Sequence, residues 1–512
     1  MSTSAAVVAG HRRGHRARRR LLRQAPLVDA PVAPSQPQGG GDETRHGENR
    51  RHLNARGGGR VDADEEADAA RRLLDATDAA SGTLLRLATA GSVDDGKSTL
   101  VGRLLFDSKS VLRDQLADVE RVSLDRGLTR TDLALLTDGL RAEREQGITI
   151  DVAYRYFATP RRSFILADCP GHVQYTRNTV TGSSTADVVV LLVDARHGVL
   201  EQTRRHLAVA ALLGVPHVVV AVNKIDLVDF SAEVYQGIAD ELERVARELG
   251  VADVRTLPTS ALEGDNIVTR SERTPFYGGP ALLELLETIP ADSAETEHPL
   301  RLPVELVLRP QGAAADGLTD YRGYAGQVTA GSLAVGDEVL VLPSGRRTRV
   351  TGINLGSQRL QRAVTGQSVA VELADDIDVA RGDVLVAADD APQLARQVQA
   401  HVAWLSERPL HERDRVLVKH GTRTVQAIVT SIDGHLDLDD LSTVPAGELE
   451  LNDIGRISLK LAEPLPVDDY SRSHADGAFL LVDPADGWTL GAGMVRTDGA
   501  RPADDARDGQ AA

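Results

Sequence analysis

The stretch from Gly91 to Ser98 combines residue types and a spacing that suit the binding of phosphate. It reads GSVDDGKS and fits the pattern G-x-x-x-x-G-K-[ST]. Glycines let the backbone curl until its N–H groups point at phosphate oxygens, and a following helix adds its positive N-terminal end. We expect Lys97 to reach the β- and γ-phosphates and Ser98 to bind Mg²⁺. The predicted binding residues of this loop are Gly91, Ser92, Val93, Asp94, Asp95, Gly96, Lys97, Ser98 and Thr99.

A second segment, DCPG at residues 168–171, ends a predicted buried strand. A carboxylate at Asp168 is suited to holding Mg²⁺ through water, and Gly171 allows a backbone N–H to approach the γ-phosphate closely. The pattern D-x-x-G alone is weak evidence for a nucleotide site, but its position one strand beyond the phosphate loop strengthens that prediction. Cys169 is interpreted as a small buried residue rather than a reactive thiol. Cys169, Pro170 and His172 complete the predicted binding segment.

The segment NKID at 223–226 indicates which base is bound. A carboxylate at Asp226 accepts hydrogen bonds from N1–H and the 2-amino group of guanine, whereas adenine would leave it unpaired. Asn223 supplies amide contacts, and the stem of Lys224 covers the base plane. The alternative is an Asp that caps a helix. The chain has only five lysines, so a lysine kept here favours the guanine interpretation. Ile225 completes this segment.

Two further segments complete the predicted site. TSAL at 259–262 follows one strand later, and the N–H groups of Ser260 and Ala261 are expected to bind the guanine carbonyl oxygen, with Leu262 beside them. Thr149, in REQGITID at 144–151, is expected to close on Mg²⁺ and the γ-phosphate and to be released after hydrolysis. Segments of these kinds in this order indicate a GTPase.

Strands and helices alternate around these segments. The runs LLRLATAG, RSFILADCPG, DVVVLLVDA and HVVVAVNKID are continuous and apolar, which is typical of strands buried on both faces of a parallel sheet. We therefore predict a doubly wound, mainly parallel α/β GTPase domain over residues 82–297. Short alternating runs broken by Gly, Pro and Asp then predict two β-barrels, over 298–390 and 391–497.

The ends of the chain differ in composition. Residues 1–81 and 498–512 are predicted to be disordered, because they are poor in residues that build a core. The basic beginning is interpreted as an inert extension, with an organelle transit peptide as the alternative.

The composition of the whole chain bears on its partners and compartment. The net charge of −17 disfavours broad nucleic-acid binding, and the single Cys fits a reducing compartment. No apolar run is long enough to span a bilayer. We expect a cytoplasmic protein that binds neither membrane nor nucleic acid.

GSVDDGKST, GIT, DCPGH and NKID followed by two barrels resemble the elongation factor Tu-like GTPases. In that family the His after D-x-P-G positions the attacking water, so the resemblance implies this role for His172. The expected catalytic residues of this chain are then His172, Lys97 and Thr149, and the residues expected to hold the metal ion are Ser98, Thr149 and Asp168.

Longer stretches are similar to the large subunit of bacterial sulfate adenylyltransferase: LALLTDGLRAEREQGITIDVAYRYF, GHVQYTRN, DARHGVLEQTRRH, SALEGDNIV, RGYAG, DDIDVARGD and GAGMV.

This resemblance, over about residues 82–497, implies that GTP hydrolysis drives formation of adenosine 5′-phosphosulfate and pyrophosphate from ATP and sulfate. It implies a separate small subunit that transfers the adenylyl group, in a heterodimer or larger heteromer. Some members carry an adenylylsulfate kinase with a second phosphate loop, and none follows residue 98 here, so we expect no kinase activity. The main alternative is a translation GTPase that delivers aminoacyl-tRNA, since fold alone does not separate the two. A third possibility is a stand-alone regulatory GTPase whose output is a change of shape.

Overall fold

The computed structural model describes residues 84–109, 113–125, 131–136, 151–291, 298–310 and 321–497. The predictions made for 1–81, for 498–512 and for Thr149 therefore lie outside the described residues.

The first domain is built on one twisted sheet of six strands in the order β2-β3-β1-β4-β5-β6. Only the edge strand β2 runs antiparallel to its neighbour, and the other neighbours are parallel. Parallel strands place their carboxyl ends at one edge, and the predicted segments 91–99, 168–172, 223–226 and 259–262 begin at or directly after such ends. The strands are β1 (Leu84–Gly91), β2 (Ala153–Ala158), β3 (Ser163–Asp168), β4 (Val188–Asp194), β5 (His217–Asn223) and β6 (Asp253–Pro258).

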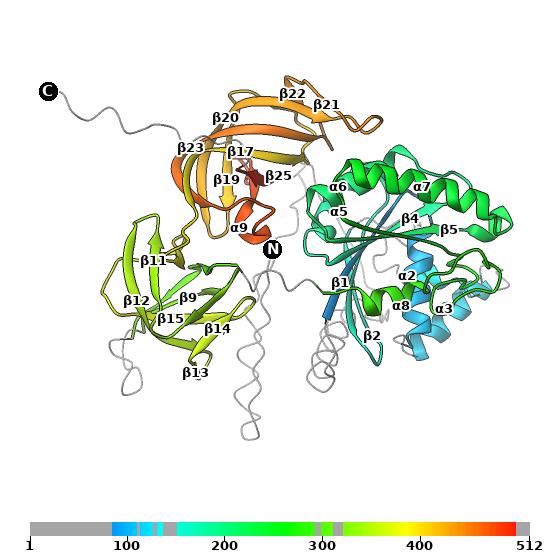
Figure 1. The fold of residues 1–512 in the computed structure, drawn as a ribbon, viewed down its shortest axis with the longest axis horizontal. Coiled ribbons are helices and arrows are strands. Elements are labelled where there is room, and N and C mark those ends of the chain that lie inside the picture. Colours follow the sequence, from blue (N-terminus) through cyan, green and yellow to red (C-terminus); the bar gives the residue numbers. More distant parts are fainter. Residues whose placement is uncertain are drawn as a thin grey trace, which may run out of the picture. The chain divides into compact units, whose positions relative to one another are not determined.

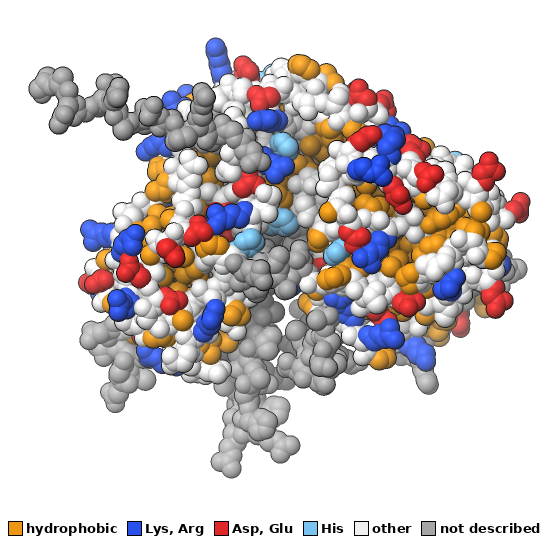
Figure 2. Space-filling model, in the orientation of Figure 1, with side chains coloured by type: hydrophobic (Ala, Val, Ile, Leu, Met, Phe, Trp, Pro, Cys, Tyr) orange, Lys and Arg blue, Asp and Glu red, His pale blue; other side chains and the backbone are white. Residues whose placement is uncertain are grey.

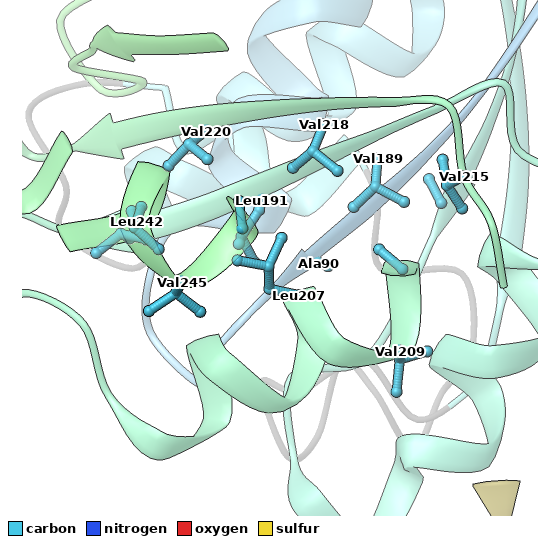
Figure 3. Packing of buried hydrophobic residues seen from close by; sticks show 14 of the residues in the cluster. Ala90, Val189, Leu191, Leu207, Val209, Val215, Val218, Val220, Leu242 and Val245 are labelled. Atoms are coloured by element: carbon cyan, nitrogen blue, oxygen red, sulfur yellow. The ribbon is translucent and has the colours of Figure 1, made fainter. Parts of the chain in front are cut away.

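Helices cover both faces of this sheet, so the predicted doubly wound α/β class is confirmed (Figure 1). Side chains of a strand alternate between faces, so Val189 and Leu191 pack on one side of β4 while Val188 and Val190 pack on the other. Figure 3 shows the first of these cores, where strand side chains meet Leu207. The helices are α2 (Lys97–Asp107), α3 (Arg113–Asp125), α5 (Thr176–Ser183), α6 (Glu201–Leu212), α7 (Ala232–Glu248) and α8 (Leu282–Thr288), with the 3-10 turns η2 (Leu133–Leu136), η3 (Val173–Tyr175) and η4 (Ile225–Val228).

The second domain is a curved antiparallel sheet with strand order β7-β16-β11-β12-β15-β9-β8, to which β13 is added at β12. Its own core contains Leu302, Tyr324 and Val371. The strands are β7 (Arg301–Pro303), β8 (Leu306–Leu308), β9 (Gly323–Gln327), β10 (Ser332–Ala334), β11 (Glu338–Leu342), β12 (Arg346–Leu355), β13 (Gln358–Leu360), β14 (Arg362–Val364), β15 (Ser368–Leu373) and β16 (Val384–Ala387).

The third domain is a closed barrel, because β19 pairs with both β20 and β24 and so completes the ring β19-β24-β25-β17-β23-β20. Trp404 lies in its core. Two barrel domains were predicted from the sequence, and the structure shows the third domain as a closed barrel and the second as a half-barrel. The elements are β17 (Gln393–Trp404), β18 (Leu410–His411), β19 (Arg415–His420), β20 (Arg423–Leu436), β21 (Thr443–Val444), β22 (Glu448–Leu449), β23 (Ile454–Val467), α9 (His474–Gly477), β24 (Ala478–Val482) and β25 (Thr489–Arg496).

Two properties of the described residues bear on the expected partners. No helix among them is long and apolar enough to cross a bilayer. Figure 2 shows basic and acidic side chains interspersed over the face in view, rather than gathered by sign. Broad nucleic-acid binding uses clustered cations, so this face does not present the charge pattern it requires.

Candidate functional site

The phosphate loop joins the end of β1 to the start of α2, as the sequence predicts. Gly96 caps α2 with a φ of 94°, in the left-handed region where glycine is favoured. A Cβ on Gly96 would lie only 2.5 Å from Nδ2 of Asn223, so this position also needs a residue without a side chain. The loop thus brings the amino end of an 11-residue helix to the carboxyl edge of the sheet. Such an end favours an anion.

Lys97 is buried at this loop and its ammonium is held by the loop itself. Nζ donates to the carbonyl oxygens of Gly91 at 3.0 Å and Ser92 at 2.7 Å. Burial lowers the pKa of Lys97, while the nearby carboxylates of Asp95 and Asp168 act in the opposite direction. A desolvated cation gains from an anionic ligand, so this environment suits the predicted contact with phosphate.

The D-x-x-G segment lies against the phosphate loop. A Cβ on Gly171 would collide with Nζ of Lys97 and would lie 2.8 Å from the carbonyl oxygen of Gly91, so only glycine fits. Asp168 is buried at the end of β3, and its carboxylate accepts a hydrogen bond from Oγ1 of Thr89 at 2.8 Å. Two segments that are far apart in the sequence therefore lie against each other at this edge of the sheet.

Cys169 and His172 differ in their exposure. Cys169 is fully buried within the core, and burial raises the pKa of its thiol, which agrees with a packing role. His172 is half-buried, and its ring meets the edge of Tyr175 at a centroid distance of 6.0 Å. The imidazole directly follows Gly171, which touches the phosphate loop. The position is compatible with the role that the family resemblance implies.

Asn223 connects the phosphate loop to the segment around Ala261. Its Nδ2 donates to the carbonyl oxygen of Asp95 at 2.7 Å, and its Oδ1 accepts from the N–H of Ala261 at 2.9 Å. Lys224 adopts a left-handed backbone with φ of 59°, and its Nζ donates to the carbonyl oxygen of Asp94. The two residues tie three separate segments together at the carboxyl edge of the sheet.

The remaining predicted base-binding residues lie beside them. Asp226 is partly buried in the first turn of η4, and Ile225 before it is fully buried. The apolar side chain of Leu262 is 56% exposed. An exposed apolar side chain of this kind is suited to covering a ring plane.

The amide groups near Ser260 differ from the expectation. The N–H of Ser260 donates to the carbonyl oxygen of Asp265 at 3.2 Å, and the N–H of Ala261 is taken by Asn223. Both groups named as donors to guanine therefore already have acceptors within the chain. The motif TSAL alone did not reveal this, because the acceptor for Ser260 lies five residues further along the same segment and the acceptor for Ala261 lies at the end of β5.

Asp194 and Arg196 also lie at the candidate site, although neither was among the predicted site residues; both stand in the stretch DARHGVLEQTRRH. Asp194 is buried at the end of β4 and accepts from Nζ of Lys224 at 2.9 Å and from the guanidinium of Arg196 at 2.6 Å. Burial alone would raise the pKa of Asp194, but the hydrogen bonds from Arg196 and Lys224 hold it well below its usual range. The available signal was position: Asp194 ends a buried strand at the same sheet edge as the motifs.

Comparison with known proteins agrees with this fold. The model of the elongation factor Tu GTP binding domain matches residues 83–292, and that of the GTP-eEF1A C-terminal domain-like family matches residues 397–496. Fold and motifs together define a phosphate-loop GTPase of the elongation factor Tu type. A crystal structure of sup35 complexed with GMPPNP is similar over 81% of this chain and 94% of its own, with 25% identity and a TM-score of 0.37.

Curated relatives narrow the family. "Sulfate adenylyltransferase subunit 1" of Alteromonas mediterranea is 46% identical, over 80% of this chain and 86% of its own. The protein of the same name from Cellvibrio japonicus is 47% identical over the same shares. "Bifunctional enzyme CysN/CysC" of Mycobacterium tuberculosis is 52% identical over 81% of this chain and 68% of its own. The chain belongs to the family of sulfate adenylyltransferase subunit 1, as the sequence predicts.

Proposed function

We propose that this chain is the GTP-hydrolysing subunit of a sulfate adenylyltransferase. Its GTPase would drive the formation of adenosine 5′-phosphosulfate and pyrophosphate from ATP and sulfate on a partner small subunit. The observation that supports this most is the convergence of the phosphate loop, DCPG and NKID through Lys97, Gly171 and Asn223. This convergence occurs in a chain that is 46% identical to "Sulfate adenylyltransferase subunit 1" of Alteromonas mediterranea.

The roles of the residues follow from this placement. Lys97 binds the β- and γ-phosphates, while Asp226 reads the edge of guanine and the stem of Lys224 covers its plane. His172 orients the attacking water. In hydrolysis the water oxygen forms a bond to the γ-phosphorus, the bond to the bridging oxygen of GDP breaks, and phosphate leaves.

A magnesium ion fits the oxygen groups of this site. The hydroxyl of Ser98 stands at the start of α2, and the buried carboxylate of Asp168 ends β3, which are hard oxygen ligands of the kind that Mg²⁺ prefers. Thr149 is the third proposed ligand and lies outside the described residues. When bound, the ion neutralises charge on the β- and γ-phosphate oxygens.

The partner and the absence of a kinase remain predictions of the family resemblance. The name subunit 1, carried by the relatives, supports a second subunit, which would hold ATP and sulfate. Relatives with "Bifunctional" in their names extend beyond the aligned part, so the expectation that this protein lacks adenylylsulfate kinase activity stays open to test.

Co-expression with a candidate small subunit from the same genome tests the proposal. We expect pyrophosphate release that depends on sulfate and increases with GTP. A complex carrying Lys97→Ala serves as the control and should keep only the basal release. If GTP has no effect and the chain instead binds aminoacyl-tRNA, the translation role is correct and the proposal fails.

A further inference from the structure

Arg103 links the helix after the phosphate loop to the segment beside the base-binding motif. It lies on α2, and its side chain is about one-fifth exposed. Nε donates to the carbonyl oxygen of Ala261 at 3.2 Å, and the terminal nitrogen Nη2 donates to that of Leu262 at 2.6 Å. These bonds join positions separated by 158 and 159 residues. None of the predicted motifs contains Arg103.

The first of these bonds fixes the direction of a backbone amide. The carbonyl of Ala261 and the N–H of Leu262 belong to one planar trans peptide, so they point in opposite directions. Because Arg103 holds the carbonyl toward α2, the N–H of Leu262 is turned away from α2. The neighbouring amides of Ser260 and Ala261 are already bonded. Within the described chain, the Leu262 amide donates to no acceptor.

We propose that Arg103 is a positioning residue that orients the Ala261–Leu262 peptide so that the N–H of Leu262 binds the 6-carbonyl oxygen of guanine. The inference rests on the proposed guanine nucleotide site and names the group that reads this part of the base. Adenine carries an amino donor at position 6, which would face the N–H without an acceptor. Arg103 thereby supports the choice of guanine without touching it.

An arginine suits this task better than a lysine. Its planar guanidinium offers donors in a fixed fork, which hold two successive carbonyl oxygens at once. The contact with Asp107 on the same helix is long, at 3.9 Å, so it contributes little to holding the fork. A variant at Asp107 therefore provides a matched control that alters the charge partner of Arg103 but leaves both carbonyl contacts.

The test compares Arg103→Ala, Arg103→Lys and the control Asp107→Asn. Calorimetry at one salt concentration gives affinities for GDP, for 6-thio-GDP, in which the 6-oxygen is replaced by sulfur, and for IDP, which lacks only the 2-amino group. We expect Arg103→Ala to weaken GDP binding about tenfold, which corresponds to about 1.4 kcal/mol. The preference for GDP over 6-thio-GDP should fall toward one, while the preference over IDP, which Asp226 reads, should stay parental.

The other variants sharpen the result. Arg103→Lys should keep part of the preference for oxygen at position 6, and Asp107→Asn should keep all of it. A parental ratio of GDP to 6-thio-GDP affinities in folded Arg103→Ala would overturn the inference and leave the proposed function standing. Equal losses for all three nucleotides would also overturn it. A parent protein that binds no guanine nucleotide would overturn the proposed function as well.

Discussion

Asn223 and Lys224 are central to the candidate site because each contacts the phosphate loop while belonging to the segment proposed to bind the base. Asn223 holds the loop at the carbonyl of Asp95, and Lys224 holds it at the carbonyl of Asp94. Asp194 in turn holds the ammonium of Lys224. The proposed base-binding segment and the phosphate loop are therefore connected by hydrogen bonds. A single substitution is expected to separate base recognition from turnover only where it breaks none of these contacts.

Asp226 is the first position at which a substitution is expected to separate base recognition from turnover. Asp226→Asn replaces an acceptor of the guanine edge by an amide that donates to the 2-carbonyl of xanthine. We expect GDP affinity to fall by about 2 kcal/mol and xanthosine diphosphate to become the preferred ligand. Nucleotide competition binding measures this, with the exposed Asp240→Asn of α7 as the control. An unchanged preference for GDP would show that Asp226 does not read the base.

His172 is the second such position. Removing its imidazole in His172→Ala should leave GTP affinity near the parental value, because Lys97 and the loop remain. Hydrolysis should slow by roughly a hundredfold, the lower range for loss of a group that handles protons or water at the reacting atoms. Single-turnover hydrolysis measures the rate, with exposed His411→Ala of the third domain as the control. Parental turnover would remove the proposed role.

At the scale of elements, the strands and the placement of motifs could be predicted from the sequence. The runs that form β4 and β5 consist mainly of Val, with Leu or Ala, and such continuous apolar runs are typical of central strands of a parallel sheet that are buried on both faces. Once these strands are parallel, the segments after β1, β3 and β5 must share one edge. For this reason the strand pattern alone groups the phosphate loop, Gly171 and Asn223 into one site.

The finer contacts could not be predicted in this way. The Arg103 side chain bonds to a residue 158 positions away in the sequence, and the acceptor of the Ala261 amide lies at the end of β5. Such contacts depend on loop conformation and on rotamers, which carry no periodic signal in the sequence. The edge strand β2 was likewise not singled out, because its side chains are mostly half-buried and its pattern is mixed.

Helix α6 carries an element-scale prediction on pH. His206 is buried against the sheet, and burial, together with the charges of Lys97 and Arg205, lowers its pKa to about 3. In the unfolded chain its pKa is about 6.5. The stabilising effect of neutral His206 is therefore complete above pH 6.5 and is lost as the pH falls toward 3, because only the unfolded chain gains the proton.

The variant His206→Gln removes this titration and keeps an amide near Gln202. Between pH 7 and pH 5.5 the parent should lose about 1 kcal/mol more unfolding free energy than the variant. Urea unfolding followed by helix circular dichroism measures the difference, with the exposed His411→Gln as the control. Equal losses of unfolding free energy in the parent and in His206→Gln would contradict the view that the buried imidazole of His206 stays neutral.

The whole molecule joins a nucleotide-binding domain to two barrel domains that each enclose a core of their own. The long helices, α2 to α8, all lie in the first domain, whereas the third has only the four-residue α9. Both tryptophans, Trp404 and Trp488, lie in the third domain, the first fully buried and the second exposed. Helix circular dichroism and tryptophan emission therefore report on different domains of the same chain.

This separation gives a prediction for nucleotide binding. A ligand that binds only the folded first domain stabilises it by about 2.7 kcal/mol at a hundred times its Kd. GDP should therefore move the helix-monitored urea transition to higher urea, while the transition followed by Trp404 emission should stay in place. Lys97→Ala should not show the shift of the helix-monitored transition, because the ligand no longer binds tightly. Equal movement of both transitions in the parent would instead show that the barrel unfolds as one cooperative unit with the GTPase domain.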